Sequence, residues 1–228
     1  MLKDKWIVFK NSSLLSKQLT DDILTIAHHS IKLNGSFKIV LTGGRSLIKT
    51  YDILRRSDSD WSKWHVYISD ERLLPAMHKD RNDQLINKIW LNNNSIPREN
   101  IHFIRSELSP IKAQREYEKV LKGVEKFDVV LLSIGEDGHI ASLFPGHDYT
   151  EDKDVVLEYN SPKSPSKRIS MSFNRLNNTR YAFKIIIGKT KKQSVNLWLK
   201  GKVLSISRIK GESDQTYACV NAIPRDYL

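Results

Sequence analysis

Residues 127–146 read FDVVLLSIGEDGHIASLFPG, an apolar run followed at once by a loop with two glycines, two acids and a histidine. Asp128 to Ile134 is apolar enough to form a central strand of a parallel sheet, since such strands are buried on both faces. Gly135 and Gly138 then permit a tight backbone path. We predict a strand over 127–134, His139 in a loop at its carboxyl end, and a helical turn over 140–144.

The same strand-then-loop order recurs along the chain. Strands are expected at 6–9, 37–41, 64–68, 168–173 and 181–187, with helices at 13–33, after the turn 42–44, and at 191–200. Strands that alternate with helices predict an α/β fold whose mainly parallel sheet is covered on both faces. We expect a loop at 161–167 and one more short strand at 203–206. No internal repeat or boundary is visible, so we expect a single domain over 1–228.

Composition narrows the classes of function. The net charge is +11, which suits nucleic acid, an anionic membrane or a negatively charged small substrate. The basic residues are spread among acids without a nucleic-acid-binding motif, so we expect no nucleic-acid partner. No stretch is apolar enough to span a membrane, and the first residues do not resemble a signal peptide, so we expect a cytoplasmic protein without a membrane partner. One cysteine, Cys219, excludes an internal disulfide.

Two further loops are expected at the same edge as the His139 loop, because ligands bind at the carboxyl ends of parallel strands. Thr42-Gly43-Gly44-Arg45-Ser46 would place free backbone N–H groups and a helix start there, which suits an anion. A plain glycine turn is the alternative, and the P-loop and dinucleotide fingerprints are absent. Asp70-Glu71-Arg72 could hold a charged substrate or orient a histidine, although exposed charge clusters of this kind are common.

Among the seven histidines, only His139 combines a strand end with two preceding glycines and neighbouring acids. Its near-neutral pKa range suits a general base, although a lone histidine is more often structural. Glu136, Asp137 and His139 are metal-ligand types, but no second histidine stands at ligand spacing, so we expect no metal. The serine-hydrolase motif G-x-S-x-G is absent.

At this point the residues resemble a known family. GEDGHIASLFPG closely resembles the G-P-D-G-H-T-A-S-L-F-P-G signature of 6-phosphogluconolactonases. Thr42–Ser46 is similar to that family's S-G-G-R/S-T-P turn, and Ser69–Arg72 to its D-E-R segment. Asp80–Asn82 resembles its D-S-N, Arg168–Ser170 its R-I-T, and Gly188 with Lys191 its G-x-x-K. The resemblance covers residues 40–192 in the family's order.

The resemblance implies a Rossmann-like three-layer α/β sandwich, shared with glucosamine-6-phosphate isomerases/deaminases. It implies hydrolysis of 6-phosphoglucono-1,5-lactone, a small sugar-phosphate lactone, to 6-phosphogluconate in the oxidative pentose phosphate pathway. No cofactor is expected. The oligomeric state is open, with a monomer slightly favoured.

The resemblance also implies roles for residues. His139 is the expected general base that activates water, and Asp70 and Arg72 are the other expected catalytic residues, with exchangeable roles in orientation and charge stabilisation. The substrate phosphate is expected on a set of glycine amides and donors: Gly43, Gly44, Arg45, Ser46, Arg168 and Lys191. Asn82, Asp137 and Gly138 are expected to complete the substrate site.

Two departures from the family pattern are Leu47 and Glu136, which stand where prolines are usual. We hypothesise that the added charge of Glu136 raises the pKa of His139.

Two alternative functions stay open. An isomerase or deaminase shares Ile140, but Ser142-Leu143-Phe144 replaces that family's F-N-E, so its acid is missing. An inert phosphosugar-binding or nucleic-acid-binding module on the same scaffold is the other.

Overall fold

Strand β6 (Phe127–Ser133) lies at the centre of a seven-stranded sheet in a computed structural model that describes residues 5–150 and 152–228. The strand order is β1-β10-β9-β6-β2-β3-β5, and every neighbouring pair is parallel. The other six strands are β1 (Trp6–Phe9), β2 (Phe37–Leu41), β3 (Trp64–Ile68), β5 (Ile101–His102), β9 (Thr179–Ile186) and β10 (Ser213–Cys219).

The sheet separates two hydrophobic cores. Along β6, Val129 and Leu131 pack into one core, whereas Val130 and Leu132 pack into the other, and all four are fully buried. Successive side chains of a strand point to opposite faces, so a strand that contains several consecutive apolar residues must be covered on both sides. The apolar run of β6 therefore explains its central place.

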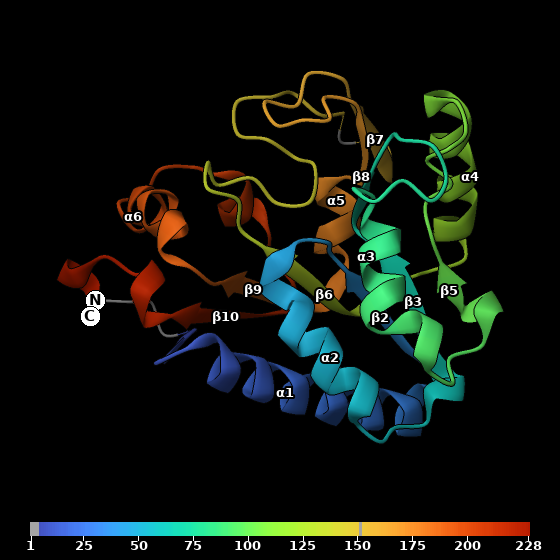
Figure 1. Cartoon of the computed structure of the whole chain (residues 1–228), viewed down its shortest axis with the longest axis horizontal. Coiled ribbons are helices and arrows are strands. Elements are labelled where there is room, and N and C mark those ends of the chain that lie inside the picture. Colours follow the sequence, from blue (N-terminus) through green and yellow to red (C-terminus); the bar gives the residue numbers. More distant parts are fainter. Residues whose placement is uncertain (1–4, 151) are drawn as a thin grey trace.

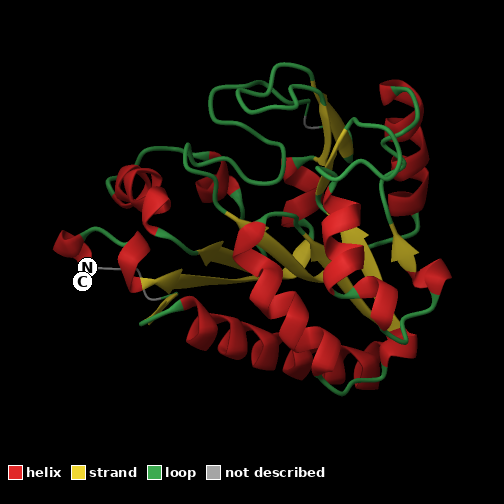
Figure 2. Ribbon diagram, in the orientation of Figure 1, coloured by secondary structure: helices red, strands yellow, loops and turns green. Residues whose placement is uncertain are grey.

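Helices cover the two faces of the sheet and make the three layers (Figures 1 and 2). On one face lie α1 (Ser12–Asn34), α2 (Ile48–Arg56) and α3 (Asn82–Ile89). On the other lie α4 (Pro110–Lys122), α5 (Phe173–Asn177) and α6 (Lys192–Leu199). Helix α1 begins where the Asn11 side chain accepts hydrogen bonds from the amides of Ser13 and Leu14, and it ends at Gly35, whose φ is 75°.

A second, three-stranded antiparallel sheet stands beyond the end of β3. It consists of β4 (Asp70–Arg72), β8 (Arg168–Met171) and β7 (Val155–Glu158), in the order β4-β8-β7. Arg72 lies directly opposite Arg168 in its register. This small sheet carries the Asp70-Glu71-Arg72 segment away from the main sheet and joins it to a segment far along the chain.

The predicted α/β fold with a mainly parallel sheet is confirmed, and the expected strands at 6–9, 37–41 and 64–68 have the observed bounds. Strands β5 and β10 were not predicted, residues 70–72 form β4 instead of the expected loop, and the strand expected at 168–173 ends at Met171. Two further predictions were wrong. Residues 203–206 form no strand but lead into a 3-10 helix at Ser205–Arg208, and 140–144 form a turn closed by a bridge between Ile140 and Leu143. Ala141 takes a φ of 47° in that turn, which no right-handed helical turn allows.

Across the described residues, no helix combines the length and the apolar character that crossing a membrane requires. The single-domain prediction covers residues 1–4 and 151, which lie outside the described residues, as does part of the chain start used to judge a signal peptide.

Candidate active site

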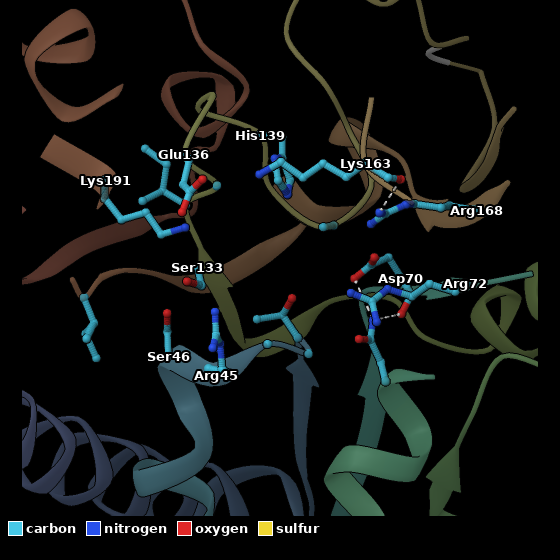
Figure 3. Close-up of a pocket in the computed structure, with 18 of the residues that line it drawn as sticks. Arg45, Ser46, Asp70, Arg72, Ser133, Glu136, His139, Lys163, Arg168 and Lys191 are labelled. Carbon is cyan, nitrogen blue, oxygen red and sulfur yellow. Dashed lines mark hydrogen bonds between the residues drawn. The ribbon is translucent and has the colours of Figure 1, made fainter. Parts of the chain in front are cut away.

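A cavity of about 420 Å³ opens at the carboxyl ends of β2, β6 and β9, beside β4 and β8 (Figure 3). Most of the residues that the sequence assigns to a site meet there. The predicted residues that line the cavity are Gly43, Gly44, Arg45, Ser46, Asp70, Arg72, Asn82, His139, Arg168 and Lys191. Asp137 and Gly138 do not line it; they belong to the loop that presents His139.

The glycine loop after β6 fixes the position of His139. The amide of Gly135 donates to the carbonyl of His139 over 2.7 Å, and the amide of Gly138 donates to the carbonyl of Gly135 over 3.1 Å. A Cβ atom on Gly135 would lie 2.1 Å from Nδ1 of His139, so only glycine leaves room for the ring. Gly138 has a φ of 89° and packs against Leu204. The ring of His139 is 14% exposed at the cavity wall.

Asp137 is the carboxylate that contacts the His139 ring. Its Oδ1 accepts a hydrogen bond from Nδ1 of His139 and a second from the His139 backbone amide at 3.2 Å. Burial raises the pKa of Asp137, but the hydrogen bond and charge of His139 outweigh it and hold that pKa well below its usual range. An ionised Asp137 assigns the ring proton to Nδ1, which leaves the Nε2 lone pair available to accept a proton.

Asp70 is buried, and its carboxylate accepts from hydroxyl groups rather than from the histidine. The hydroxyl of Ser142 donates to its Oδ2 over 2.6 Å, and the hydroxyl of Ser69 donates to its Oδ1 over 3.0 Å. The side-chain amide of Asn82 donates to the backbone carbonyl of Asp70 over 2.9 Å. These contacts fix the carboxylate at the cavity wall, where it is 3% exposed.

Arg72 and Arg168 face the cavity from directly opposed positions of β4 and β8. Arg168 is held by donating to the carbonyls of Pro165 at 3.0 Å and Lys163 at 2.9 Å, and it lies over the Phe144 ring. Burial lowers the pKa of Arg168. Arg72 donates to the carbonyl of Asp80, but its buried Nε has no partner among the described residues.

Two helix starts without side-chain caps open onto the cavity. The first follows Gly44, whose φ is 94°, and runs through the 3-10 turn Arg45–Leu47 into α2. The second follows Gly188, whose φ is 102°, and runs through the turn Lys189–Lys191 into α6. Backbone N–H groups at such starts lack intrahelical partners and attract anions. Leu47, where the family pattern has proline, is fully buried, so it packs into the core instead.

Glu136 lies at the rim beside Thr190 and Lys191 rather than on the ring of His139 (Figure 3). The neighbouring Thr190 hydroxyl, then the charges of Lys191 and Lys163, lower the pKa of Glu136. Burial lowers the pKa of Lys191, and the charge of Glu136 opposes that effect. The hypothesis that Glu136 raises the pKa of His139 stays a prediction.

Sequence reasoning missed two contributors to the site. Lys163, from the loop 161–167, lines the cavity with its side chain directed across the wall that carries His139 (Figure 3). Ser142 holds Asp70. Lys163 brings the lining to five cations, Arg45, Arg72, Lys163, Arg168 and Lys191, against the two carboxylates of Asp70 and Glu136. The cavity is therefore built for an anion with more than one charge.

A protein-family model described as "Glucosamine-6-phosphate isomerases/6-phosphogluconolactonase" matches residues 10–218. The chain is 37% identical over 205 residues to 6-phosphogluconolactonase 3, chloroplastic, of Arabidopsis thaliana, covering 80% of this chain and 63% of that protein. It is 38% identical over 191 residues to probable 6-phosphogluconolactonase 4, chloroplastic, of Oryza sativa subsp. japonica, covering 75% and 59%. The chain thus spans about three fifths of the length of these relatives.

Two solved structures share the fold. The crystal structure of 6-phosphogluconolactonase from Thermotoga maritima superposes with a TM-score of 0.88 at 25% identity, covering 94% of this chain and 98% of that one. A monomeric glucosamine-6-phosphate deaminase superposes with a TM-score of 0.82 at 18% identity, covering 96% and 98%. The second likeness shows the fold alone, which is the predicted Rossmann-like sandwich.

Proposed function

The chain belongs to the family of glucosamine-6-phosphate isomerases and 6-phosphogluconolactonases, and we propose that it hydrolyses 6-phosphoglucono-1,5-lactone to 6-phosphogluconate. The observation that carries the proposal is the hydrogen bond between Nδ1 of His139 and Oδ1 of Asp137, with Nε2 left as the base in a cavity lined by five cations. The names of the relatives support the same activity.

In the proposed reaction, Nε2 of His139 takes a proton from water as the water oxygen attacks the lactone carbonyl carbon. The carbonyl oxygen becomes an oxyanion, and the guanidinium of Arg72, a residue that lines the cavity, is proposed to stabilise that charge. The C–O bond to the ring oxygen then breaks, and His139 returns the proton to the departing oxygen. The product acid ionises, so each turnover releases one proton into solution.

Asp137 keeps the ring in the reactive tautomer throughout and stabilises the imidazolium form. Asp70, fixed by Ser142 and Asn82, is proposed to orient the substrate hydroxyls, because its position at the wall is set before substrate arrives. Family resemblance implied either this role or contact with the histidine. The geometry supports the role in orienting substrate hydroxyls, because Asp137, and not Asp70, is hydrogen-bonded to the ring of His139.

The substrate phosphate is proposed to lie between the two uncapped helix starts, with Arg45, Ser46 and Lys191 around it. Gly43 and Gly44 let the backbone approach closely there. Arg168 stands on the opposite wall beside Arg72, so its predicted contact with the phosphate stays a prediction. Because phosphate is remote from the reacting carbon, its binding energy serves to position the lactone.

The test follows hydrolysis of freshly generated 6-phosphogluconolactone above its spontaneous rate, by proton release in weak buffer. Wild type should accelerate it, and His139→Ala should lose about 10²- to 10⁴-fold in kcat. His147→Ala is the matched control, because His147 also pairs with a carboxylate, Glu158, but does not line the cavity. Equal acceleration by wild type and His139→Ala would refute the base assignment alone.

The same preparations should release no ammonia from glucosamine-6-phosphate. Release would favour the isomerase/deaminase alternative, and an inactive but folded wild type would favour a binding module. The compartment stays a prediction: the sequence favours the cytoplasm, whereas the names of two relatives include the word chloroplastic.

A further inference from the structure

Glu71 is a buried carboxylate between two residues of the cavity wall. Asp70 and Arg72 line the cavity, whereas Glu71 does not, because neighbouring residues of a strand point to opposite faces. Glu71 is 1% exposed. Its side chain therefore cannot touch substrate, and burying a carboxylate costs free energy unless partners compensate for the lost water.

The partners of Glu71 are three backbone amides. Its Oε1 accepts from the amides of Arg72 at 2.8 Å and Asn82 at 2.7 Å, and its Oε2 accepts from the amide of Asp83 at 2.8 Å. Asn82 and Asp83 are the first two residues of α3, and the residue before the helix provides no side-chain cap. Glu71 thus caps α3 from a neighbouring strand and satisfies amides that the helix leaves without partners.

The first residue of α3 links the two halves of the cavity. The side-chain amide of Asn82 donates to the carbonyl of Asp70 at 2.9 Å and reaches its Oδ1 at 3.4 Å. A Cβ atom on Gly43 would lie 1.9 Å from Oδ1 of Asn82, so the same side chain also abuts the turn proposed to bind phosphate. A shift of α3 would therefore move Asn82 against both Asp70 and Gly43.

We propose that Glu71 is a positioning residue: by capping α3 it holds the Asn82 side chain between Asp70 and the Gly43 turn. The proposal rests on the lactonase function proposed above for its consequence in catalysis. Misplacing reacting groups by about 1 Å can cost about 10²-fold in rate. Loss of the helix cap would therefore lower the rate by displacing the side chain of Asn82.

The experiment compares Glu71→Gln with wild type. The amide group of glutamine would place N–H donors against backbone N–H donors, so the cap weakens while the side-chain volume stays the same. We expect kcat/KM to fall about 10- to 100-fold, with a higher KM as well as a lower kcat. A variant that is only less stable has less folded enzyme but the same KM, so a change in KM separates the two effects.

Asp128→Asn is the matched control. Asp128 is also a buried carboxylate bonded to a backbone amide, that of Lys38 at 2.7 Å, but it lies at the start of β6, away from the cavity. Its replacement should lower stability and leave KM unchanged. If Asp128→Asn and Glu71→Gln change KM alike, the effect is general destabilisation and the proposal fails.

A double-mutant cycle tests the route through Asn82. In an Asn82→Ala background, Glu71→Gln should cost little more, because the side chain that it positions is gone. Additive losses would overturn the proposal, and so would an Asn82→Ala enzyme with wild-type kcat/KM, even if Glu71→Gln fails to fold.

Hydrogen exchange tests whether Glu71 caps α3, and this test does not depend on catalytic activity. The amides of Arg72, Asn82 and Asp83 should exchange slowly in wild type and faster in Glu71→Gln. Equally slow exchange in both would show that Glu71 does not hold α3, whatever the enzyme hydrolyses. An inactive wild type with the expected exchange pattern would instead refute the lactonase function and leave the helix cap intact.

Discussion

Nδ1 of His139 donates to Oδ1 of Asp137, two residues earlier in the same loop. The pair is local: the turn between Gly135 and His139 brings the carboxylate back onto the ring. Asp137 is about a third exposed, while the ring is 14% exposed. The tautomer of the proposed base is therefore set within a single loop.

Asp137→Asn should lower kcat about 10²-fold or more, because an asparagine amide can donate to Nδ1 and move the ring proton to Nε2. KM should change little, since Asp137 does not line the cavity. The measurement is kcat and KM for lactone hydrolysis by proton release.

The neighbouring Glu136→Gln provides the control for this loop. Glu136 faces Thr190 and Lys191, so its neutralisation should leave kcat near the wild-type value. If Asp137→Asn keeps wild-type kcat, the proposed role of Asp137 is wrong. If Glu136→Gln shifts the acidic limb of the pH profile downward, the hypothesis that Glu136 acts on His139 is supported.

Lys163→Ala should raise KM about 10- to 150-fold, since one charge-assisted contact to a substrate contributes about 1.5–3 kcal/mol. Lys163 lines the cavity and has no described carboxylate within ion-pair distance. Lys167→Ala is the matched control, because Lys167 belongs to the same loop and its residue is exposed outside the cavity. Equal KM values for the two variants would exclude Lys163 from the substrate site.

Five of the seven parallel strands could be predicted because each contains a short, largely apolar run that ends at a turn. The other two, β5 (Ile101–His102) and β10 (Ser213–Cys219), lack such a run and were not predicted. Phe37–Leu41 and Trp64–Ile68 have the predicted bounds for this reason. Asp70–Arg72 carries three charges and has no strand pattern; it becomes β4 only because β8 pairs with it. Pairing between distant segments leaves no periodic signal in either one.

The residues of the site show the same contrast: those next to a predicted strand could be predicted, and those placed by contacts between distant segments could not. His139 and the Gly43-Gly44 turn could be predicted, since each follows a predicted strand directly. Asp70 was assigned to the histidine or to substrate hydroxyls, and only the turn geometry showed that Asp137 contacts the ring. Lys163 was predicted to lie in a loop, but its arrival at the cavity depends on Arg168 holding that loop by its carbonyls. Such contacts join segments whose spacing in sequence carries no information.

The stacked pair of His65 and His102 predicts a loss of stability in mild acid. The rings lie on neighbouring strands β3 and β5 with centroids 6.1 Å apart, and Nε2 of His102 is buried without a partner among the described residues. Burial, then the charge of His65, lowers the pKa of His102 to about 4. Burial and the charge of Lys38 lower the pKa of His65 in the same direction.

The sign follows from the folded pKa lying below the unfolded one. Above about pH 6.5 both the folded and the unfolded state hold a neutral imidazole, and the stability is fully present. As the pH falls from about 6.5 towards 4, only the unfolded state takes up the proton, and stability is lost.

In His102→Gln this part of the pH dependence of stability should flatten. The change in slope should be less than the roughly 1.4 kcal/mol per pH unit that one full proton gives, because the ring is partly exposed. The free energy of unfolding in denaturant at pH 7.5, 6 and 5 measures it, with His28→Gln in the exposed part of α1 as control. Identical slopes for wild type and His102→Gln would show that His102 is not the group that titrates.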